Sequence, residues 1–237
     1  MQNMLEKTLA VLVRERPQRW RVFDDLGLDY CCGGNRSLAD ACREGGVDPV
    51  AALARIRDSE AQPAPTGEPD FSTMPLGQFV DHIENVHHAY MHRELPRITA
   101  LLDKVTKVHA GRHPELLKIK AIFEALAAEL GDHLAKEEQV LFPMIRQMET
   151  ATTMPEFHCG TLQNPIRVMR HEHDNAGEAL HQMRELTKNY EAPGDACDSY
   201  RALYRALAEM ERDLHQHIHE ENNLLFPRAV EREARMA

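Results

Sequence analysis

One pattern occurs twice in this 237-residue chain, and it restricts the possible fold more than any other feature. The segments HLAKEEQVLFP at 133–143 and HIHEENNLLFP at 217–227 share histidine first, glutamate four residues later, and Leu-Phe-Pro at the end. The two segments begin 84 residues apart. Each lies within a long stretch of helix-favouring sequence, so the chain is expected to contain two copies of a helix pair.

Each copy also has a histidine well upstream of the shared segment. His88 lies 45 residues before His133, and His173 lies 44 residues before His217. The four histidines therefore fall on four successive stretches whose residues recur with helical periodicity. These stretches cover about 76–107, 115–148, 162–190 and 197–232. The fold class predicted is all-α, an up-down-up-down four-helix bundle with short connections.

The residues before the bundle form a separate small piece. Residues 1–57 contain short helical segments with clear stops, including a capping pattern that begins at Ser37. Residues 58–75 are rich in proline and almost free of apolar side chains, which is typical of a semi-rigid linker. The predicted organisation is a small helical domain at 1–57, a linker at 58–75 and the bundle at 76–237. The linker could span roughly 50 Å, so the two domains need not be fixed neighbours.

The histidine and glutamate of each copy fall on the apolar face of their helix. Spacing of four residues places His133 beside Glu137, and His217 beside Glu221. The apolar stripes that include these pairs consist of Ile119, Phe123, Leu126, Leu130, Leu141 and Met144 in one copy and Leu203, Leu207, Met210, Leu214 and Leu225 in the other. A single His-x3-Glu pair is commonly a solvated surface pair. Two in register inside a bundle cost several kcal/mol per carboxylate unless a cation compensates them.

No lysine or arginine on these faces could pair with the carboxylates, so the pattern predicts metal binding. Four histidines and two glutamates suit two six-coordinate ions that share two bridging carboxylates and a bridging oxide or hydroxide. About two positions then stay open for water, O2 or NO. Nitrogen and oxygen ligands with open positions favour iron, with manganese second, whereas zinc favours four-coordinate sites.

The first ligand is open between two adjacent histidines. Apolar residues early in the helix place His87 on the buried side, whereas later ones favour His88, and the repeat offset fits His88. The other histidines, His82 and His219 among them, are expected at the surface or at helix ends.

Charge and cysteine content restrict the cellular setting and the partners. The chain has 28 Lys and Arg against 38 Asp and Glu, a net charge of −10, so nucleic-acid binding is not expected. No apolar run is long enough to span a membrane. Five cysteines, an odd number, argue for free thiols in the cytoplasm.

Cys31 and Cys32 are adjacent in the loop Asp29-Tyr-Cys-Cys-Gly-Gly34. Their Cα atoms lie about 3.8 Å apart, below the range for an unstrained disulfide. Gly33 and Gly34 could turn backbone amides toward the sulfurs and so favour thiolates. Such thiolates could accept iron or NO; the alternative is that the pair is simply small and half-buried.

The paired His-x3-Glu helices, the Leu-Phe-Pro segments and the Asp-Tyr-Cys-Cys-Gly-Gly loop resemble the repair-of-iron-centres family over nearly the whole chain. Members are di-iron proteins with a hemerythrin-like bundle and a small N-terminal Cys-Cys domain. By motif, the resemblance places the metal ligands at His88, His133, Glu137, His173, His217 and Glu221. The Leu95-Pro96 pair seven residues after His88 supports that histidine over His87.

The resemblance implies a cytoplasmic stress protein that restores iron–sulfur clusters damaged by nitric oxide or oxidants, by donating iron. Its partners would be damaged iron–sulfur proteins, with NO or O2 as small ligands, and Cys31 and Cys32 would take part in thiol chemistry or iron transfer. The same di-iron site would also serve an enzyme that reduces NO to N2O, or a sensor of O2 or NO. The chain could form a homodimer.

Overall fold

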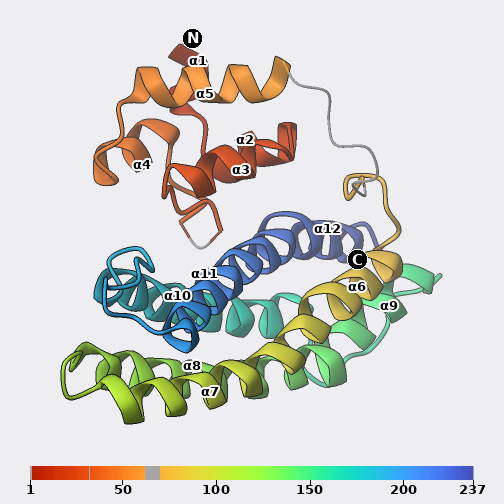
Figure 1. Ribbon diagram of the computed structural model, residues 1–237. Helices are drawn as coiled ribbons and strands as arrows, with labels where there is room; N and C mark the ends of the chain where they lie inside the picture. The colour runs from red at the N-terminus through yellow and green to blue at the C-terminus, as the bar shows by residue number, and fades with distance from the viewer. Residues whose placement is uncertain (1, 32, 62–69, 237) are drawn as a thin grey trace.

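The computed structural model describes residues 2–31, 33–61 and 70–236, and all elements named within these ranges are helical (Figure 1). The fold is therefore all-α, as predicted. The helices before residue 62 are α1 (Gln2–Glu6), α2 (Leu9–Glu15), α3 (Arg19–Asp25), α4 (Leu38–Glu44) and α5 (Pro49–Ala61). We call these helices and their loops the N-terminal unit.

The bundle consists of four rods, three of them interrupted by a π-helical segment. The rods are α6 (Leu76–Ile83) with η1 (Glu84–His88) and α7 (Ala89–His109); α8 (Glu115–Lys136) with η2 (Glu137–Leu141) and α9 (Phe142–Thr150); α10 (Gln163–Leu186); and α11 (Asp198–His219) with η3 (Glu220–Leu225) and α12 (Phe226–Ala234). Helix α7 lies against α8 and α11, and α10 lies against the same two helices. Figure 1 shows the rods packed side by side with short connections, which confirms the predicted bundle.

Capping side chains begin two of the helices in the N-terminal unit, α2 and α4. The Ser37 side chain accepts a hydrogen bond from the Asp40 amide at 3.1 Å, as its capping pattern predicts. A single helix from Leu5 to Glu15 is also expected from periodicity, but the structure divides it. Thr8 takes an extended conformation and caps α2, while the Leu9 amide donates to the Arg36 carbonyl oxygen at 3.0 Å. This hydrogen bond to a distant segment of the same chain replaces a helical hydrogen bond at the break.

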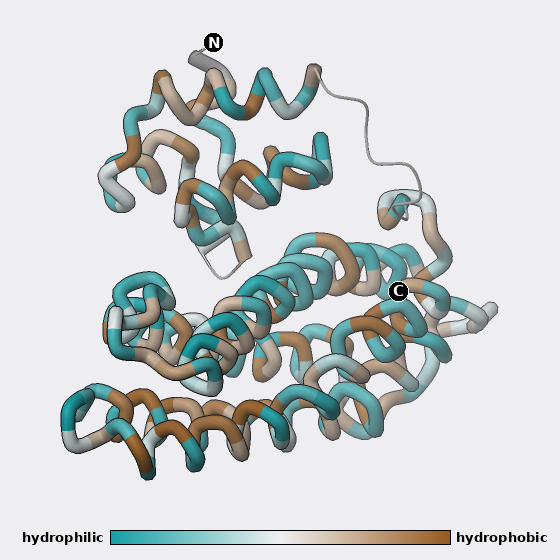
Figure 2. The backbone as a smooth tube through the Cα atoms, in the orientation of Figure 1, coloured by the Kyte–Doolittle hydropathy of each residue, from teal (hydrophilic) through white to brown (hydrophobic). Residues whose placement is uncertain are grey.

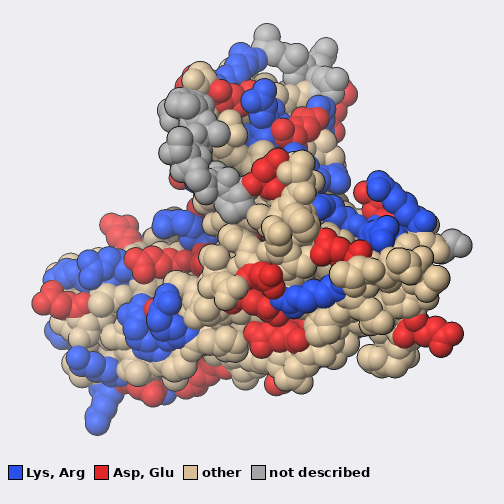
Figure 3. Space-filling model, turned by 90° about the vertical axis from the view of Figure 1, so that its right-hand side faces the viewer, with Lys and Arg blue, Asp and Glu red and all other residues tan. Residues whose placement is uncertain are grey.

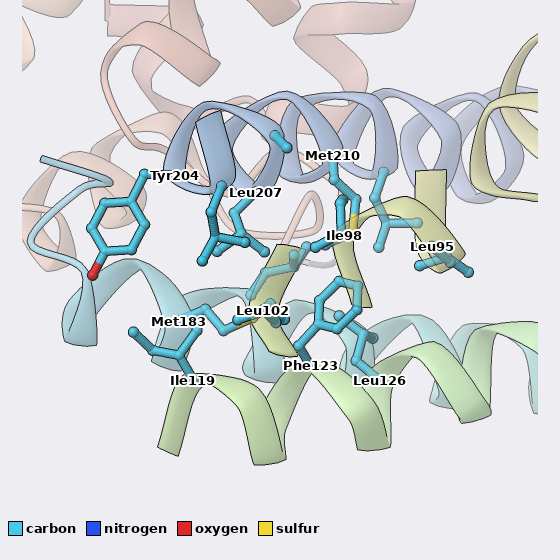
Figure 4. Packing of buried hydrophobic residues seen from close by; sticks show 14 of the residues in the cluster. Leu95, Ile98, Leu102, Ile119, Phe123, Leu126, Met183, Tyr204, Leu207 and Met210 are labelled. Atoms are coloured by element: carbon cyan, nitrogen blue, oxygen red, sulfur yellow. The ribbon is translucent and has the colours of Figure 1, made fainter. Parts of the chain in front are cut away.

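The bundle contains two separate apolar clusters along its length. Figure 4 shows part of the larger one, in which Phe123 of α8 lies among leucine and methionine side chains from α7, α10 and α11. The second cluster joins α6, α9 and α12 to the start of α10. Hydrophobic and hydrophilic residues alternate along α7 and α8 (Figure 2), as expected for helices with one buried face.

The predicted domain limits at 57 and 75 stay predictions. Helix α5 runs to Ala61 and α6 begins at Leu76, and residues 62–69 of the expected linker lie outside the described residues. On the face in Figure 3, basic and acidic side chains are interspersed over both the N-terminal unit and the bundle. Within the described ranges, no helix is long and apolar enough to cross a membrane.

The central position of Phe123 gives a test of the core. The Phe123→Ala substitution should lower the free energy of unfolding by about 3–5 kcal/mol, because the ring is completely buried and its loss leaves a cavity. Urea denaturation followed by circular dichroism, with a chelator present so that metal binding does not contribute, measures this change. The control is Leu117→Ala on the same helix, since Leu117 is 56% exposed and should change stability by less than about 0.5 kcal/mol. Equal losses in both variants would contradict this account of the core.

Candidate metal centre

The three π-helical segments lie at the level of the bundle where polar side chains point into its interior. In η2 the Phe142 amide donates to the Glu137 carbonyl oxygen five residues back, and in η3 the Phe226 amide donates to the Glu221 carbonyl oxygen in the same way. The Ala89 amide similarly bonds the Glu84 carbonyl oxygen across η1. Such wider turns are frequent at functional sites and change the helical phase of the residues around them.

The structure brings together all six residues that the sequence singled out. They form two groups that share both carboxylates, and within each group the ligand atoms lie within 4.8 Å of one another. One group contains His88 and His217, the other His133 and His173, and both contain Glu137 and Glu221. All six side chains are buried, and each glutamate is 0% exposed.

Each carboxylate faces one imidazole from each group. Oε2 of Glu137 lies 3.4 Å from Nε2 of His88 and 3.5 Å from Nε2 of His133. Oε1 of Glu221 lies 3.1 Å from Nε2 of His217, and its Oε2 lies 3.1 Å from Nε2 of His173. The four Nε2 atoms therefore point inward to a space flanked by two carboxylates. This arrangement suits two neighbouring cations that share bridging ligands.

Three of the four imidazoles are held in place through the opposite ring nitrogen. Nδ1 of His88 lies 2.8 Å from Glu138, and Nδ1 of His133 lies 2.9 Å from Glu172. Nδ1 of His173 lies 3.1 Å from Oδ1 of Asn222. A partner on Nδ1 leaves Nε2 available as a ligand atom and orients the ring, which is the usual support for histidine bound to a metal.

Sequence reasoning did not single out Glu138, Glu172 and Asn222. A signal for two of them was present, because Glu138 and Asn222 each follow the shared glutamate directly and so occupy equivalent positions in the repeat.

The inward-facing atoms have few partners of their own. Both oxygens of Glu137 and of Glu221, together with Nε2 of His88 and of His217, make no hydrogen bond within the described part of the chain. Nε2 of His133 and of His173 lie only 3.1 Å from each other. Buried polar atoms without partners cost free energy, and a cation bound between them would satisfy all of them at once. The donor set of imidazole nitrogen and carboxylate oxygen fits iron.

Among the protein groups alone, a proton balances part of the buried negative charge. Burial lowers the pKa of His173, but the negative charge of Glu221, whose Oε2 lies 3.1 Å from Nε2 of His173, outweighs burial and raises the pKa to about 9. Burial lowers the pKa of His217, which lies beside two further imidazoles. Although burial opposes it, His217 and His173 hold the pKa of Glu221 well below its usual value. A cation at Nε2 of His173 must displace its proton, so metal affinity should rise with pH.

The adjacent histidines His87 and His88 are both buried but face different partners. His88 belongs to the six-residue cluster, whereas Nδ1 of His87 lies 3.1 Å from Asp213 and its Nε2 lies 3.3 Å from Glu220. A regular helix would turn adjacent residues about 100° apart, and the π-helical turn of η1 allows both rings to be buried. His219, expected at the surface or at a helix end, is the last residue of α11, and its ring is buried against Tyr30 of the N-terminal unit.

The loop that contains the cysteines contacts the bundle. Cys31 is buried against the larger apolar cluster, and its thiol donates to Oδ1 of Asp29 at 3.3 Å. The Gly33 amide donates to Oδ2 of Asp29 at 2.8 Å, and the expected effect of the two glycines on the cysteine sulfurs stays a prediction. Cys32 lies outside the described residues.

Two residues near Glu221 hold this loop. Nδ2 of Asn223 donates to the Tyr30 carbonyl oxygen at 3.1 Å, and the Tyr30 ring packs edge-on against His219 with centroids 5.4 Å apart. Gly34 is needed for this close approach, since a Cβ there would lie 2.6 Å from the Tyr30 oxygen and 3.4 Å from Asn223. The cysteine loop is thereby attached to the helix that supplies Glu221.

A pocket of about 540 Å³ opens between the loop and the bundle. Cys31 lies in its wall with Asp29 and Arg36 from the N-terminal unit, facing Glu211 and His215 of α11. Acidic groups outnumber basic ones in this wall, because Asp24, Glu44, Asp174 and Glu178 also line it, against Arg184 and Arg36. The pocket is therefore suited to a cation or to a positively charged group.

Comparison with known proteins agrees with this geometry. Residues 80–229 match the hemerythrin HHE cation binding domain family, and residues 5–60 match ScdA_N, described as a domain of unknown function (DUF542). A probable iron-sulfur cluster repair protein of Haemophilus influenzae is 34% identical over 228 residues, which cover 96% of this chain and 98% of that protein.

Two further relatives carry the name iron-sulfur cluster repair protein YtfE. The protein of Musicola paradisiaca is 36% identical over 97% of this chain and 98% of its own length. That of Salmonella typhimurium is 36% identical over 95% of this chain and 97% of its own length. With these likenesses over nearly its whole length, and a bundle that matches the hemerythrin family, the chain belongs to the hemerythrin-like iron–sulfur cluster repair family.

Proposed function

We propose that this chain repairs iron–sulfur clusters damaged by nitric oxide or oxidants, by donating iron from a dinuclear centre in its bundle. The observation that carries the proposal is the convergence of four Nε2 atoms on two completely buried carboxylates. The names of relatives similar over nearly the full length support the repair role. Its partners are then damaged iron–sulfur proteins, encountered in the cytoplasm.

In this proposal, the two groups of residues hold one iron ion each. His88 and His217 bind the first, His133 and His173 bind the second, and Glu137 with Glu221 bridges the two. Three imidazoles would keep the ring orientation they already have, because Glu138, Glu172 and Asn222 hold their Nδ1 atoms. Six protein ligands leave open positions, at which bound iron supplies binding and redox chemistry toward NO or O2.

The cysteine loop is proposed as the route by which iron leaves. Cys31 combines a thiol, a soft ligand for iron, with the neighbouring carboxylate of Asp29. The same thiol borders the acidic pocket, which would attract a released cation. Since the loop is anchored to Asn223, two residues from Glu221, movement of the loop and of the bridging carboxylate would be coupled.

A repair assay tests the function directly. Chain loaded with ferrous iron, mixed without oxygen with a [4Fe–4S] dehydratase inactivated by NO, should restore dehydratase activity. The comparison is the same amount of ferrous salt and reductant without the chain. Activity no greater than in that comparison would contradict iron donation by this protein.

The bridging role of the carboxylates predicts the metal content. Glu221→Gln should lower the iron held by the six-residue cluster from two ions per chain to less than one, because it removes the shared negative charge from both groups. Iron is measured by elemental analysis after desalting, with circular dichroism to verify the fold. The matched control is Glu124→Gln on α8, where the carboxylate is exposed and pairs with Lys120; it should keep both ions. Full iron content in Glu221→Gln would refute the bridging assignment.

The transfer role of the thiol predicts a different outcome for its removal. Cys31→Ser should keep two iron ions per chain, since the sulfur is not among the six convergent ligands, yet lower the rate of repair at least about tenfold. The readouts are iron content and the dehydratase assay. Cys197→Ser is the control, because Cys197 is an exposed cysteine of the bundle, and it should repair at the normal rate. Equal loss of iron and activity in Cys31→Ser would mean that the loop serves the metal centre and not transfer.

A further inference from the structure

A second cluster of metal-ligating side chains lies beside the six residues described above. It consists of His82, His87 and Glu220, whose ligand atoms all lie within 4.8 Å of one another. Nε2 of His82 and Nε2 of His87 each lie 3.3 Å from Oε2 of Glu220. His87 and Glu220 are buried, and the His82 side chain is 20% exposed.

The three convergent atoms lack other partners. Nε2 of His82, Nε2 of His87 and Oε2 of Glu220 form no hydrogen bond of acceptable geometry with any described residue. Two of the opposite atoms are held, since Nδ1 of His87 lies 3.1 Å from Asp213 and Oε1 of Glu220 accepts from Gln216 at 3.0 Å. His87 therefore resembles His88, His133 and His173: its Nδ1 is anchored and its Nε2 points to a shared space.

An ion pair alone does not account for the cluster. Each neutral ring can carry its proton on Nε2 and face Oε2 of Glu220, but neither 3.3 Å contact has hydrogen-bond geometry. Protonation of both rings would place two cations against this single oxygen atom. A divalent metal ion satisfies all three atoms, and two imidazoles with one carboxylate are a recognised ligand set for mononuclear ferrous iron and for zinc.

The position of the cluster relates it to the proposed dinuclear centre. His87 precedes His88 in η1, and Glu220 precedes Glu221 in η3. The His87 ring stacks on the His217 ring, with centroids 5.3 Å apart and planes 2° from parallel. On the other side, the partly exposed His82 ring packs against Phe71 with centroids 4.9 Å apart. The cluster thus lies between the six-residue site and the surface.

We propose that His82, His87 and Glu220 form a third, mononuclear site for ferrous iron, separate from the dinuclear centre. The ligand set leaves positions for water, so an ion bound here can exchange. Its location makes it a staging point for iron that enters or leaves the dinuclear centre. This staging role rests on the proposed function, whereas the binding of iron at the site is independent of it.

Ion counting tests the binding. The full chain is dialysed without oxygen against a fixed concentration of ferrous salt, and bound iron is measured for wild type and for His82→Gln. Wild type should bind one ion more than the variant, whose affinity for that ion should be at least about tenfold weaker. The His181→Gln control removes an exposed imidazole of α10 that pairs with Glu185, and should bind as wild type does. Equal iron in wild type and His82→Gln would overturn the proposal.

The same measurement separates this proposal from the dinuclear assignment. The difference between wild type and His82→Gln reports the third site, while the iron that remains in the variant reports the dinuclear centre. Glu220→Gln gives a second test with a nearly unchanged side-chain shape and should also lose one ion. If that variant unfolds or loses all iron, the His82→Gln result still decides, because the described contacts of the His82 ring are with Phe71, His87 and Glu220.

The staging role has its own readout. Transfer of iron from loaded chain to an excess of a coloured ferrous chelator should have a fast phase of one ion and a slow phase of the rest. His82→Gln should lose the fast phase and slow the remaining phase several-fold, while His181→Gln should keep both rates. If the slow phase of His82→Gln has the wild-type rate, the staging role is refuted.

Discussion

Two completely buried carboxylates, Glu137 and Glu221, determine how this bundle is built. Carboxylates at this depth are tolerated only with cations or strong donors around them. All four rods therefore place an imidazole at the same level, and the apolar core divides into one cluster above that level and another below it. Along α10, for example, Met169 belongs to one cluster, His173 to the polar level, and Ala176 to the other cluster.

The N-terminal unit contacts this polar level at η3 and at the adjoining end of α11. Glu220 and Glu221 face the interior, while Asn223, two residues farther along η3, bonds the Tyr30 carbonyl oxygen at the cysteine loop. A π-helical turn makes this possible, because it presents more consecutive residues to different neighbours than an α-helical turn does. The proposed ligand Glu221 and the residue that holds the loop, Asn223, are thus parts of one structural element.

The sequence predicted the bundle and the six convergent residues because both depend on periodicity. His133 with Glu137 and His217 with Glu221 have helical spacing within apolar stripes, and nothing else in the fold changes that. Periodicity alone left His87 and His88 open, because the spacing rule assumes a regular helix and η1 is not regular; the repeat offset and the family resemblance favoured His88. The burial of His219 depends on contact with the N-terminal unit, a tertiary contact that no local pattern encodes.

The cluster of His82, His87 and Glu220 follows from an asymmetry between the two halves of the repeat. The residue before His173 is Glu172, which supports Nδ1 of His133; the residue before His88 is His87, which stacks on His217 instead.

Within the described ranges, Nδ1 of His217 has no hydrogen-bond partner. An imidazole whose Nδ1 lacks a hydrogen-bond partner is a weaker metal ligand. In the proposed dinuclear centre, an ion held by His88 and His217 would therefore be the more weakly bound of the two, and it would lie on the side where His87 and Glu220 meet. The imidazole that replaces a supporting carboxylate would thus loosen one ion and, with Glu220, provide a neighbouring place to receive it.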